Sequence, residues 1–451
     1  MSPVTQAVLA SWSFPPYATA LILLTALLYL RGWLALRVAM PTRFTLLRLS
    51  SFLAGLAVLE IALASPIDAF DPFLLTDHMI QHMLLMMIVP PLILLGDPEI
   101  PLLHGLPRWA SQRVVGPIVS SSPVRWLGNG LANPALAWLL LSVAMLGWHV
   151  PAAYELALRS PAWHEVEHAC FLVTALLFWW PVIQPWPSRA RWPRWTMPIY
   201  LLLADFVNSA LSAFLAFSDR VLYPSYLAVP RLWGISAQTD QAAAGVSMWV
   251  IGSFAFLIPA VWLTVELLSP SAPQPERPPR PEPSDVRVKR PVLAALTVAL
   301  PLAALAYGWF APDTIDIDDA TVRFQSVLGP FHVSVFGPRD PIEPGDCDIS
   351  VLVQDARSEE PILDADVDVS LQASNSAAGA PVRATRQQSS NKLLESASTE
   401  LPSSGSWQLQ VSVHRGSEYA AVSSTLQVTE MGTAQVAAKS STSTASDDSR
   451  H

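Results

Sequence analysis

Long apolar runs, rather than alternating patterns, dominate the first 310 residues of the chain. A helix needs about 20 mostly apolar residues to cross the hydrocarbon core of a bilayer. Eight segments reach or approach that length, at residues 17–37, 46–65, 74–95, 134–152, 163–183, 197–217, 243–268 and 291–310. Several contain proline or polar residues, which neighbouring helices or cavities can satisfy. The pattern predicts an all-α integral membrane bundle, with a seven-helix core at residues 1–268 and an eighth helix at 291–310.

The pattern changes from about residue 324 to short runs in which apolar and polar residues alternate. The runs are FHVSVFG, CDISVLVQD, DADVDVSLQ, SWQLQVSVH and SSTLQVTE, and turn residues separate them. Five or more short strands of this kind indicate a small all-β, immunoglobulin-like sandwich, which we expect at residues 311–430. The proline-rich, charged stretch 269–290 predicts an extended linker, and the Ser-, Thr- and Ala-rich residues 431–451 predict a disordered tail.

Composition narrows the class of protein. The chain is 51% hydrophobic and 14% charged, whereas an ordinary globular protein is about 25% charged. A typical soluble enzyme is therefore excluded. Residues 311–451 carry more than twice as many acidic as basic side chains, which gives no reason to expect nucleic acid as a partner. Motifs of nucleotide-binding enzymes, serine hydrolases and zinc proteases are missing, so we expect no enzymatic activity.

Basic residues alternate between the two sides of the predicted bundle. The first, third and fifth connections and the linker are rich in arginine, at Arg37, Arg43, Arg48, Arg108, Arg113, Arg125, Arg189, Arg191, Arg194, Arg277, Arg280, Arg287 and Arg290. The other connections hold mostly acidic residues. Because basic loops stay in the cytoplasm, we expect the N-terminus and the C-terminal domain outside and the linker inside. The N-terminus lacks the basic region of a cleaved signal peptide.

The predicted topology brings five histidines to one membrane depth on the outer side. They are His78 and His82 in TDHMIQHMLLMM, His149 in MLGWHVP, and His164 and His168 in WHEVEH. Two of these pairs have i,i+4 spacing, which places both imidazoles on one helix face. Imidazole and thioether together suit copper, especially Cu(I). We therefore predict a copper site from the five histidines, with Met83 and Met86 as the better-placed methionines.

Ordinary structural explanations compete with a metal site. A single helical histidine pair is more often hydrogen-bonded than metal-bound, and methionines in membrane helices usually pack against lipid or the core. Convergence of five histidines from three helices favours a site, because ionisable groups inside membranes are functional by default. Two other functions stay open. One is a copper permease, and the other is a haem b electron carrier with haem between His82 and His168.

Three acidic residues are candidate supporting groups. Asp205, in LLADFVNSA, lies in the middle of the sixth predicted helix, so it is either a ligand or proton-relay group or a partner in a structural hydrogen bond. Asp240 is either the N-cap of the seventh helix or a partner that fixes an imidazole tautomer. Glu167, beside His168, invites the same two interpretations as Asp240.

Four stretches around these residues resemble the signature stretches of the multispanning CtaG family. They are HMIQHMLLMMIVPPLILLGDP, GWHVPAAYELAL, HEVEHACFLVTALLFWWPVI and TDQAAAGVSMWVIG. Members of that family are assembly factors of caa-type haem–copper cytochrome c oxidases. The resemblance covers about residues 15–268, and His78, His82, His149 and His168 fall within its motifs.

The resemblance implies a multi-pass protein of the bacterial inner membrane. It implies copper delivery to, or copper-centre maturation of, an oxidase from the extracytoplasmic side, with oxidase subunits and the lipid bilayer as partners. The sandwich, which opens with GPFHVSVFGPRDPIEPGDCDISVLVQDA, is similar in pattern to small periplasmic domains of the YtkA or FixH type. Because that likeness rests on pattern more than on motif, no metal-binding residues can be carried over from it to the sandwich.

Overall fold

The computed structural model of the chain describes residues 1–188, 191–269, 321–373 and 380–429. These residues divide into two compact units. The larger unit comprises the described residues of 14–225 and 238–312, and the smaller comprises 1–13, 226–237 and those of 313–451. The expected linker (269–290), apart from Ser269, the expected eighth helix (291–310) and the expected tail (431–451) lie outside the described residues.

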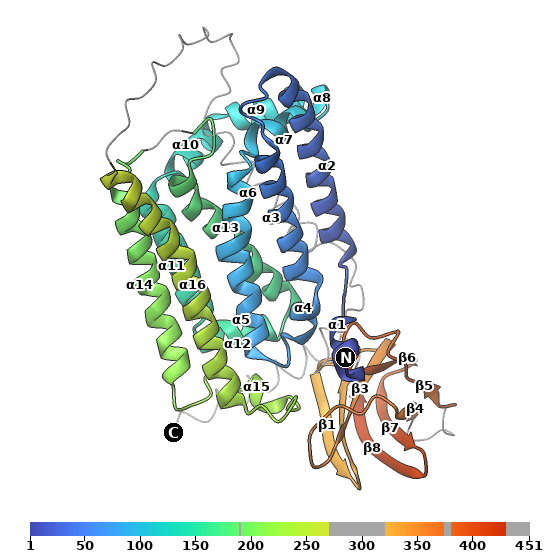
Figure 1. Cartoon of the computed structure of the whole chain (residues 1–451). Coiled ribbons are helices and arrows are strands. Elements are labelled where there is room, and N and C mark those ends of the chain that lie inside the picture. The colour runs from blue at the N-terminus through green and yellow to red at the C-terminus, as the bar shows by residue number, and fades with distance from the viewer. Residues whose placement is uncertain (189–190, 270–320, 374–379, 430–451) are drawn as a thin grey trace, which may run out of the picture. The chain divides into compact units, whose positions relative to one another are not determined.

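The larger unit is a bundle of helices, six of which are long and apolar enough to cross a membrane. They are α2 (Pro16–Ala39), α3 with α4 (Leu46–Ala64, Pro66–Phe70), α5 continuing into α6 (Leu75–Met83, Val89–Leu95), α13 (Pro161–Ile183), α14 (Thr196–Phe217) and α16 (Ala237–Leu268). Figure 1 shows these helices running side by side. The all-α membrane bundle expected from the sequence is confirmed.

A seventh expected span is bent rather than straight. The sequence predicted one helix at residues 134–152, but α11 (Pro134–Trp148) and α12 (Pro151–Leu158) meet at 75°. Pro151 stands in the first turn of α12, and a residue that precedes proline is driven out of the helical region. Val150 is accordingly extended. His149 caps the end of α11, so it lies at the bend.

Pro90 and Pro91 interrupt the third span with a wider helical turn but do not end it. The chain forms a π-helical turn at Leu84–Ile88, and α6 begins at Val89 with proline in its first turn. Proline has no N–H and its ring clashes with the preceding turn, and a wider turn is a common way to accommodate such an interruption. The helix then continues to Leu95.

The short helices collect at the two ends of the bundle. Figure 1 shows α4, α5 and α12 at one end. The helices α7 (Glu99–Gly105), α8 (Arg108–Ala110), α9 (Gly116–Ser120) and α10 (Ser122–Leu131) lie at the other. The histidine-bearing segments and the arginine-rich third connection are therefore at opposite ends.

The smaller unit contains two four-stranded antiparallel sheets, which confirms an all-β domain. One sheet has the order β1 (Thr321–Leu328), β2 (Phe331–Gly337), β3 (Gly345–Asp355) and β6 (Glu395–Leu401). The other has the order β5 (Val382–Arg383), β4 (Asp366–Ala373), β7 (Gly405–Arg415) and β8 (Glu418–Val428). All five strands predicted from alternation are present, and β1, β5 and β6 were not predicted.

Alternation explains the core of the sandwich. Inward positions of β2, β3, β4 and β7, such as Val333, Val351, Val369 and Val411, are fully buried in one hydrophobic cluster. Cys347 belongs to this cluster, so it is a packing residue. The same unit includes α1 (Pro3–Leu9) and most of α15 (Ser225–Ala228). The backbone N–H of Lys392 donates to Ser11 Oγ over 2.9 Å within it.

Candidate metal centre

Two helices of the larger unit carry the polar side chains of the candidate site. His78 and His82 lie one turn apart on α5, and His164, Glu167 and His168 lie on adjacent turns of α13. The spacings of three and four residues place each set on a single helix face. The two faces meet, because the ring centroids of His82 and His168 are 5.5 Å apart.

Asp240 fixes the start of α5 from another helix. Its carboxylate accepts hydrogen bonds from the backbone N–H of Leu75 (2.7 Å) and of Thr76 (3.1 Å) and from the Thr76 hydroxyl (2.6 Å). The first N–H groups of a helix have no partner within the helix, so this carboxylate serves as a cap. Asp240 therefore caps α5 instead of its own helix, and it positions the segment that carries His78 and His82.

Four side chains converge on one point. One ligand atom from each of His78, His82, His164 and Glu167 lies within 4.8 Å of the others. The Nε2 atoms of His78 and His82 each lie 3.8 Å from a different oxygen of Glu167. Asp71, in the connection before α5, places its Oδ2 3.5 Å from Nδ1 of His78 and 3.5 Å from Nε2 of His164. Both ring nitrogens of His78 therefore face a carboxylate.

Hydrogen bonds within the described residues do not satisfy this cluster. His78, His82 and Glu167 are fully buried, and neither the ring nitrogens of the two histidines nor the two oxygens of Glu167 have a hydrogen-bond partner there. Nε2 of His168 is also buried and also lacks a hydrogen-bond partner among the described residues. Buried polar atoms without a partner are rare in folded proteins and call for an explanation. Their concentration in one place makes this cluster a candidate site for a ligand.

The separations favour an ion over direct or water-mediated hydrogen bonds. A hydrogen bond to nitrogen spans about 2.7–3.2 Å, and two groups bridged by one water lie roughly 4.5 Å apart. Two donor atoms about 2.1 Å from one tetrahedral ion lie about 3.4 Å apart. The distances of 3.8 Å from Nε2 of His78 and of His82 to the Glu167 oxygens lie closer to the last value than to either of the others. A set of imidazoles and a carboxylate suits copper or zinc.

Burial raises the pKa of two groups next to the cluster, Asp71 and Tyr223. The pKa of the Asp71 carboxyl is raised well above its ordinary value by burial, because an ionised carboxylate out of water is costly without a cation beside it. Burial also raises the pKa of the Tyr223 hydroxyl, which stays protonated and donates to the backbone oxygen of His149 over 3.1 Å.

His149 lies beside the cluster with both ring nitrogens in contact with other groups. Its Nδ1 is 2.6 Å from the backbone oxygen of Met145, and its Nε2 is 3.4 Å from Sδ of Met79. Its ring centroid is 6.5 Å from that of His82. The structure thus separates His149 from the group that contains His78, His82, His164 and Glu167. Met83 and Met86, the methionines singled out in the sequence, are fully buried, and their role stays a prediction.

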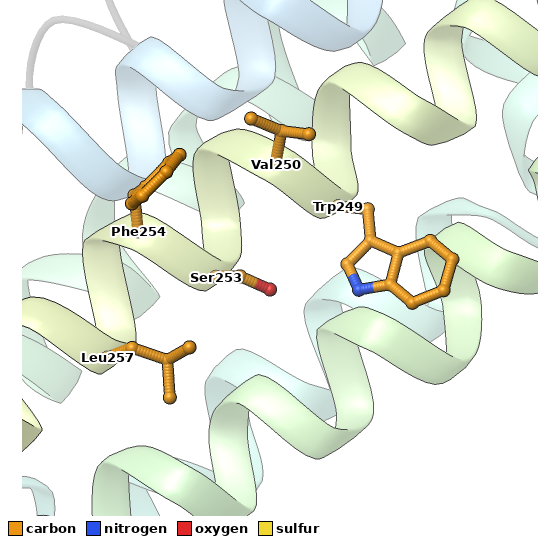
Figure 2. Close-up of a pocket in the computed structure, with 5 residues that line it drawn as sticks. All are labelled: Trp249, Val250, Ser253, Phe254 and Leu257. Atoms are coloured by element: carbon orange, nitrogen blue, oxygen red, sulfur yellow. The ribbon is translucent and has the colours of Figure 1, made fainter.

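Asp205 has a different setting. Its Oδ1 accepts a hydrogen bond of 3.0 Å from the hydroxyl of Ser253, which is on α16. Ser253 lies in a groove of 370 Å³ along that helix, shown in Figure 2 with its other lining residues, Trp249, Val250, Phe254 and Leu257. The lining is apolar apart from Ser253. Asp205 is therefore bonded to a neighbouring helix and is not part of the histidine cluster, and a supporting role for it stays a prediction.

Sequence reasoning missed two residues of this region. Asp71 stands seven residues before His78, on the same connection as Asp68, and only the folding back of α4 onto α5 reveals its place. Met79 was recognisable as the methionine next to His78 but was not singled out, because the bend that brings His149 to it was not expected. His104 is in α7, at the other end of the bundle, and its Nδ1 lies 3.0 Å from the Ile100 backbone oxygen.

The family model described as "Cytochrome c oxidase caa3 assembly factor" matches residues 27–269. Uncharacterized proteins of Mycobacterium bovis and Mycobacterium tuberculosis are each 28% identical to the chain over 284 residues, which is 61% of this chain and 41% of each relative. One from Mycobacterium leprae is 24% identical over 273 residues, covering 59% and 40%.

The chain thus spans about two fifths of the length of these relatives. Among solved structures, the PKD domain of the human VPS10 domain-containing receptor SorCS2 matches at 15% identity. The match covers 27% of this chain and 92% of that domain, with a TM-score of 0.16. A score this low carries no argument.

Proposed function

The chain belongs to the family of cytochrome c oxidase caa3 assembly factors, and from this premise we propose that it delivers copper to the oxidase or supports maturation of its copper centres. The proposal covers what the family leaves open, namely the cargo, the side of the membrane and the residues. Copper is the cargo of this protein, taken up and passed on, and the role is one of binding rather than catalysis.

One observation carries the proposal. Three histidines and a glutamate bring ligand atoms within 4.8 Å of one another in a buried part of the bundle. Most of these atoms lack hydrogen bonds within the described residues. A protein that only needed packing at this position would lose stability by burying such groups. A bound ion would supply the missing interactions and offset the free-energy cost of burying these groups.

The direction of delivery follows from the loop charges. The arginine-rich connections argue for a cytoplasmic location of the end that holds α7 to α10. The cluster belongs to the opposite end, with α4, α5 and α12. We therefore propose that copper is handled on the extracytoplasmic side of the bacterial inner membrane and reaches an oxidase subunit there.

The geometry gives less support to the two alternatives. A porphyrin between His82 and His168 needs open space around both rings, but the ring centroid of His78 lies 4.3 Å from that of His82 and the ring centroid of His164 lies 4.1 Å from that of His168. A permease needs a continuous polar path. The polar pair of Asp205 and Ser253 lies next to an apolar groove, which is a poor start for such a path.

The test combines metal analysis with oxidase maturation. The purified full chain should contain or take up copper, and a strain lacking it should lose oxidase activity. His82→Ala should abolish maturation while the protein stays at normal abundance in the membrane. His104→Ala, at the other end of the bundle, is the matched control and should behave as wild type. Equal activity of the two variants would refute the proposed site.

Loss of protein in parallel with activity would instead assign the histidines a structural role. Copper flux into proteoliposomes separates delivery from transport: a copper-dependent flux would make the protein a permease. A sharp Soret band in the purified protein would indicate haem.

A further inference from the structure

His149 is held by two hydrogen bonds, one at its ring and one at its backbone oxygen. Its Nδ1 lies 2.6 Å from the backbone oxygen of Met145, one turn back on α11. The Tyr223 hydroxyl donates to the backbone oxygen of His149 over 3.1 Å. The residue as a whole is only 6% exposed. A ring fixed in this way at the bend between α11 and α12 can present only one nitrogen to the interior.

The contact with Met145 identifies which ring nitrogen carries the proton. A carbonyl oxygen only accepts, so Nδ1 of His149 must be the donor. A doubly protonated ring would bring an unpaired charge into a buried position, which is costly. The neutral ring therefore keeps a lone pair on Nε2.

That lone pair faces a thioether. Nε2 of His149 lies 3.4 Å from Sδ of Met79, a residue of α5 that is fully buried. A thioether sulfur has no hydrogen to donate. With the proton on Nδ1, neither atom can donate to the other, although they are in contact.

The distance fits two ligands of one ion. With metal–nitrogen and metal–sulfur bonds of about 2.0 and 2.3 Å, a tetrahedral centre separates nitrogen from sulfur by roughly 3.5 Å. Imidazole with thioether is a soft donor pair and selects Cu(I), whereas a set with carboxylate also accepts Zn(II) and Cu(II).

We propose that Nε2 of His149 and Sδ of Met79 form a second, Cu(I)-selective position beside the cluster of His78, His82, His164 and Glu167. This inference rests on the proposed function only in taking copper as the cargo. The two positions share α5, since Met79 and His82 are three residues apart on that helix. The His82 and His149 rings are 6.5 Å apart between centroids, so an ion can move between the positions without entering bulk water.

The experiment compares Cu(I) with Zn(II) on the purified full chain in detergent. Cu(I) is titrated against a chromogenic Cu(I) chelator under anaerobic conditions, and Zn(II) uptake is measured by elemental analysis. Wild type should bind one equivalent of Zn(II) and two of Cu(I). The Cu(I) form should show a sulfur scatterer near 2.3 Å in X-ray absorption.

Met79→Leu tests the thioether with little change in side-chain volume, and Met87→Leu is the control, because Met87 is also buried but lies in the π-helical turn. Met79→Leu should keep the Zn(II) equivalent, lose the sulfur scatterer and weaken the second Cu(I) equivalent at least tenfold. His149→Gln should weaken the same equivalent. Met87→Leu should match wild type.

The outcomes distinguish the two proposals. Zn(II) binding with a single Cu(I) equivalent, or sulfur scattering that persists in Met79→Leu, would overturn the soft position and leave the cluster intact. Failure of wild type to bind either ion would overturn the cluster and the proposed function with it.

Discussion

Oδ2 of Asp71 lies 3.5 Å from Nδ1 of His78, on the side of the ring opposite Glu167. Histidines that bind metals nearly always offer their other ring nitrogen to a carboxylate or carbonyl, which fixes the tautomer. If Nε2 of His78 binds an ion together with Glu167, Asp71 occupies the place of that orienting carboxylate. It would act through His78 rather than as a ligand.

Asp71→Asn should therefore weaken metal binding without abolishing it. Loss of an orienting carboxylate typically lowers metal affinity by about 10–100-fold, and we expect a change of that size in Zn(II) or Cu(I) titrations. Asp68→Asn is the matched control: Asp68 lies on α4, which ends just before Asp71, and its Oδ1 accepts from Gln81 Nε2 over 2.7 Å, which an asparagine oxygen also does. Similar affinities for the two variants would argue against an orienting role.

Glu167→Gln should separate the effect of Glu167 on the stability of the metal-free protein from its effect on metal binding. Glutamine removes a buried carboxylate without a hydrogen-bond partner among the described residues, so the metal-free variant should be at least as stable as wild type. The free energy of unfolding of the wild type should rise by about 2.7 kcal/mol at a metal concentration 100 times the dissociation constant. At that concentration the variant should lose most of this gain. Thermal unfolding with and without Zn(II) measures both effects.

Glu165→Gln is the control for that experiment, because Glu165 is exposed on the same helix. It should leave the metal-dependent shift in melting temperature unchanged. A metal-dependent shift of wild-type size in Glu167→Gln would show that Glu167 is not a ligand.

Asp240→Ala should destabilise the start of α5, the helix that carries His78 and His82. The carboxylate accepts three hydrogen bonds from Leu75 and Thr76 at the start of α5, and loss of a helix cap costs about 0.5–2 kcal/mol. We expect a lower unfolding temperature and faster amide exchange at the start of α5. Asp219→Ala, at an exposed position, should change neither. Unaltered exchange in Asp240→Ala would contradict the capping role.

The bundle was predictable because the membrane imposes a simple length rule. Six apolar runs became spanning helices with ends within a few residues of expectation, except that α16 begins at Ala237 instead of near 243. The fold of the sandwich followed from period-two alternation. Strands β1 and β6 were not predicted because TVRFQSVL and ESASTEL alternate poorly, and because β6 pairs with β3, which is distant in the sequence.

The site was only partly predictable. Spacing of three and four residues identified the faces of α5 and α13, which the structure brings together at His78, His82, His164 and Glu167. The setting of His149 depends on the bend at Pro151, and the setting of Asp240 depends on packing between helices far apart in the sequence. Loop charges predict which end faces outward, and this can be checked with alkaline phosphatase, which should be active when fused after Ser326 and inactive after Arg287.

The sandwich should fold alone and protect its cysteine. Residues 320–430 contain Cys347 as their only cysteine, and its side chain lies in the core between the two sheets. Burial raises the pKa of the Cys347 thiol from 9.0 to about 11, so near pH 8 the folded domain should hold about a hundredfold less thiolate than the unfolded chain. The fragment should give a β-type circular dichroism spectrum and a cooperative melt. Alkylation by iodoacetamide at pH 8 should be slow in buffer and fast in urea, and its rate in buffer should rise with pH up to about pH 11. A random-coil spectrum, or equal alkylation rates in buffer and in urea, would show that these strands need the rest of the chain to form their core.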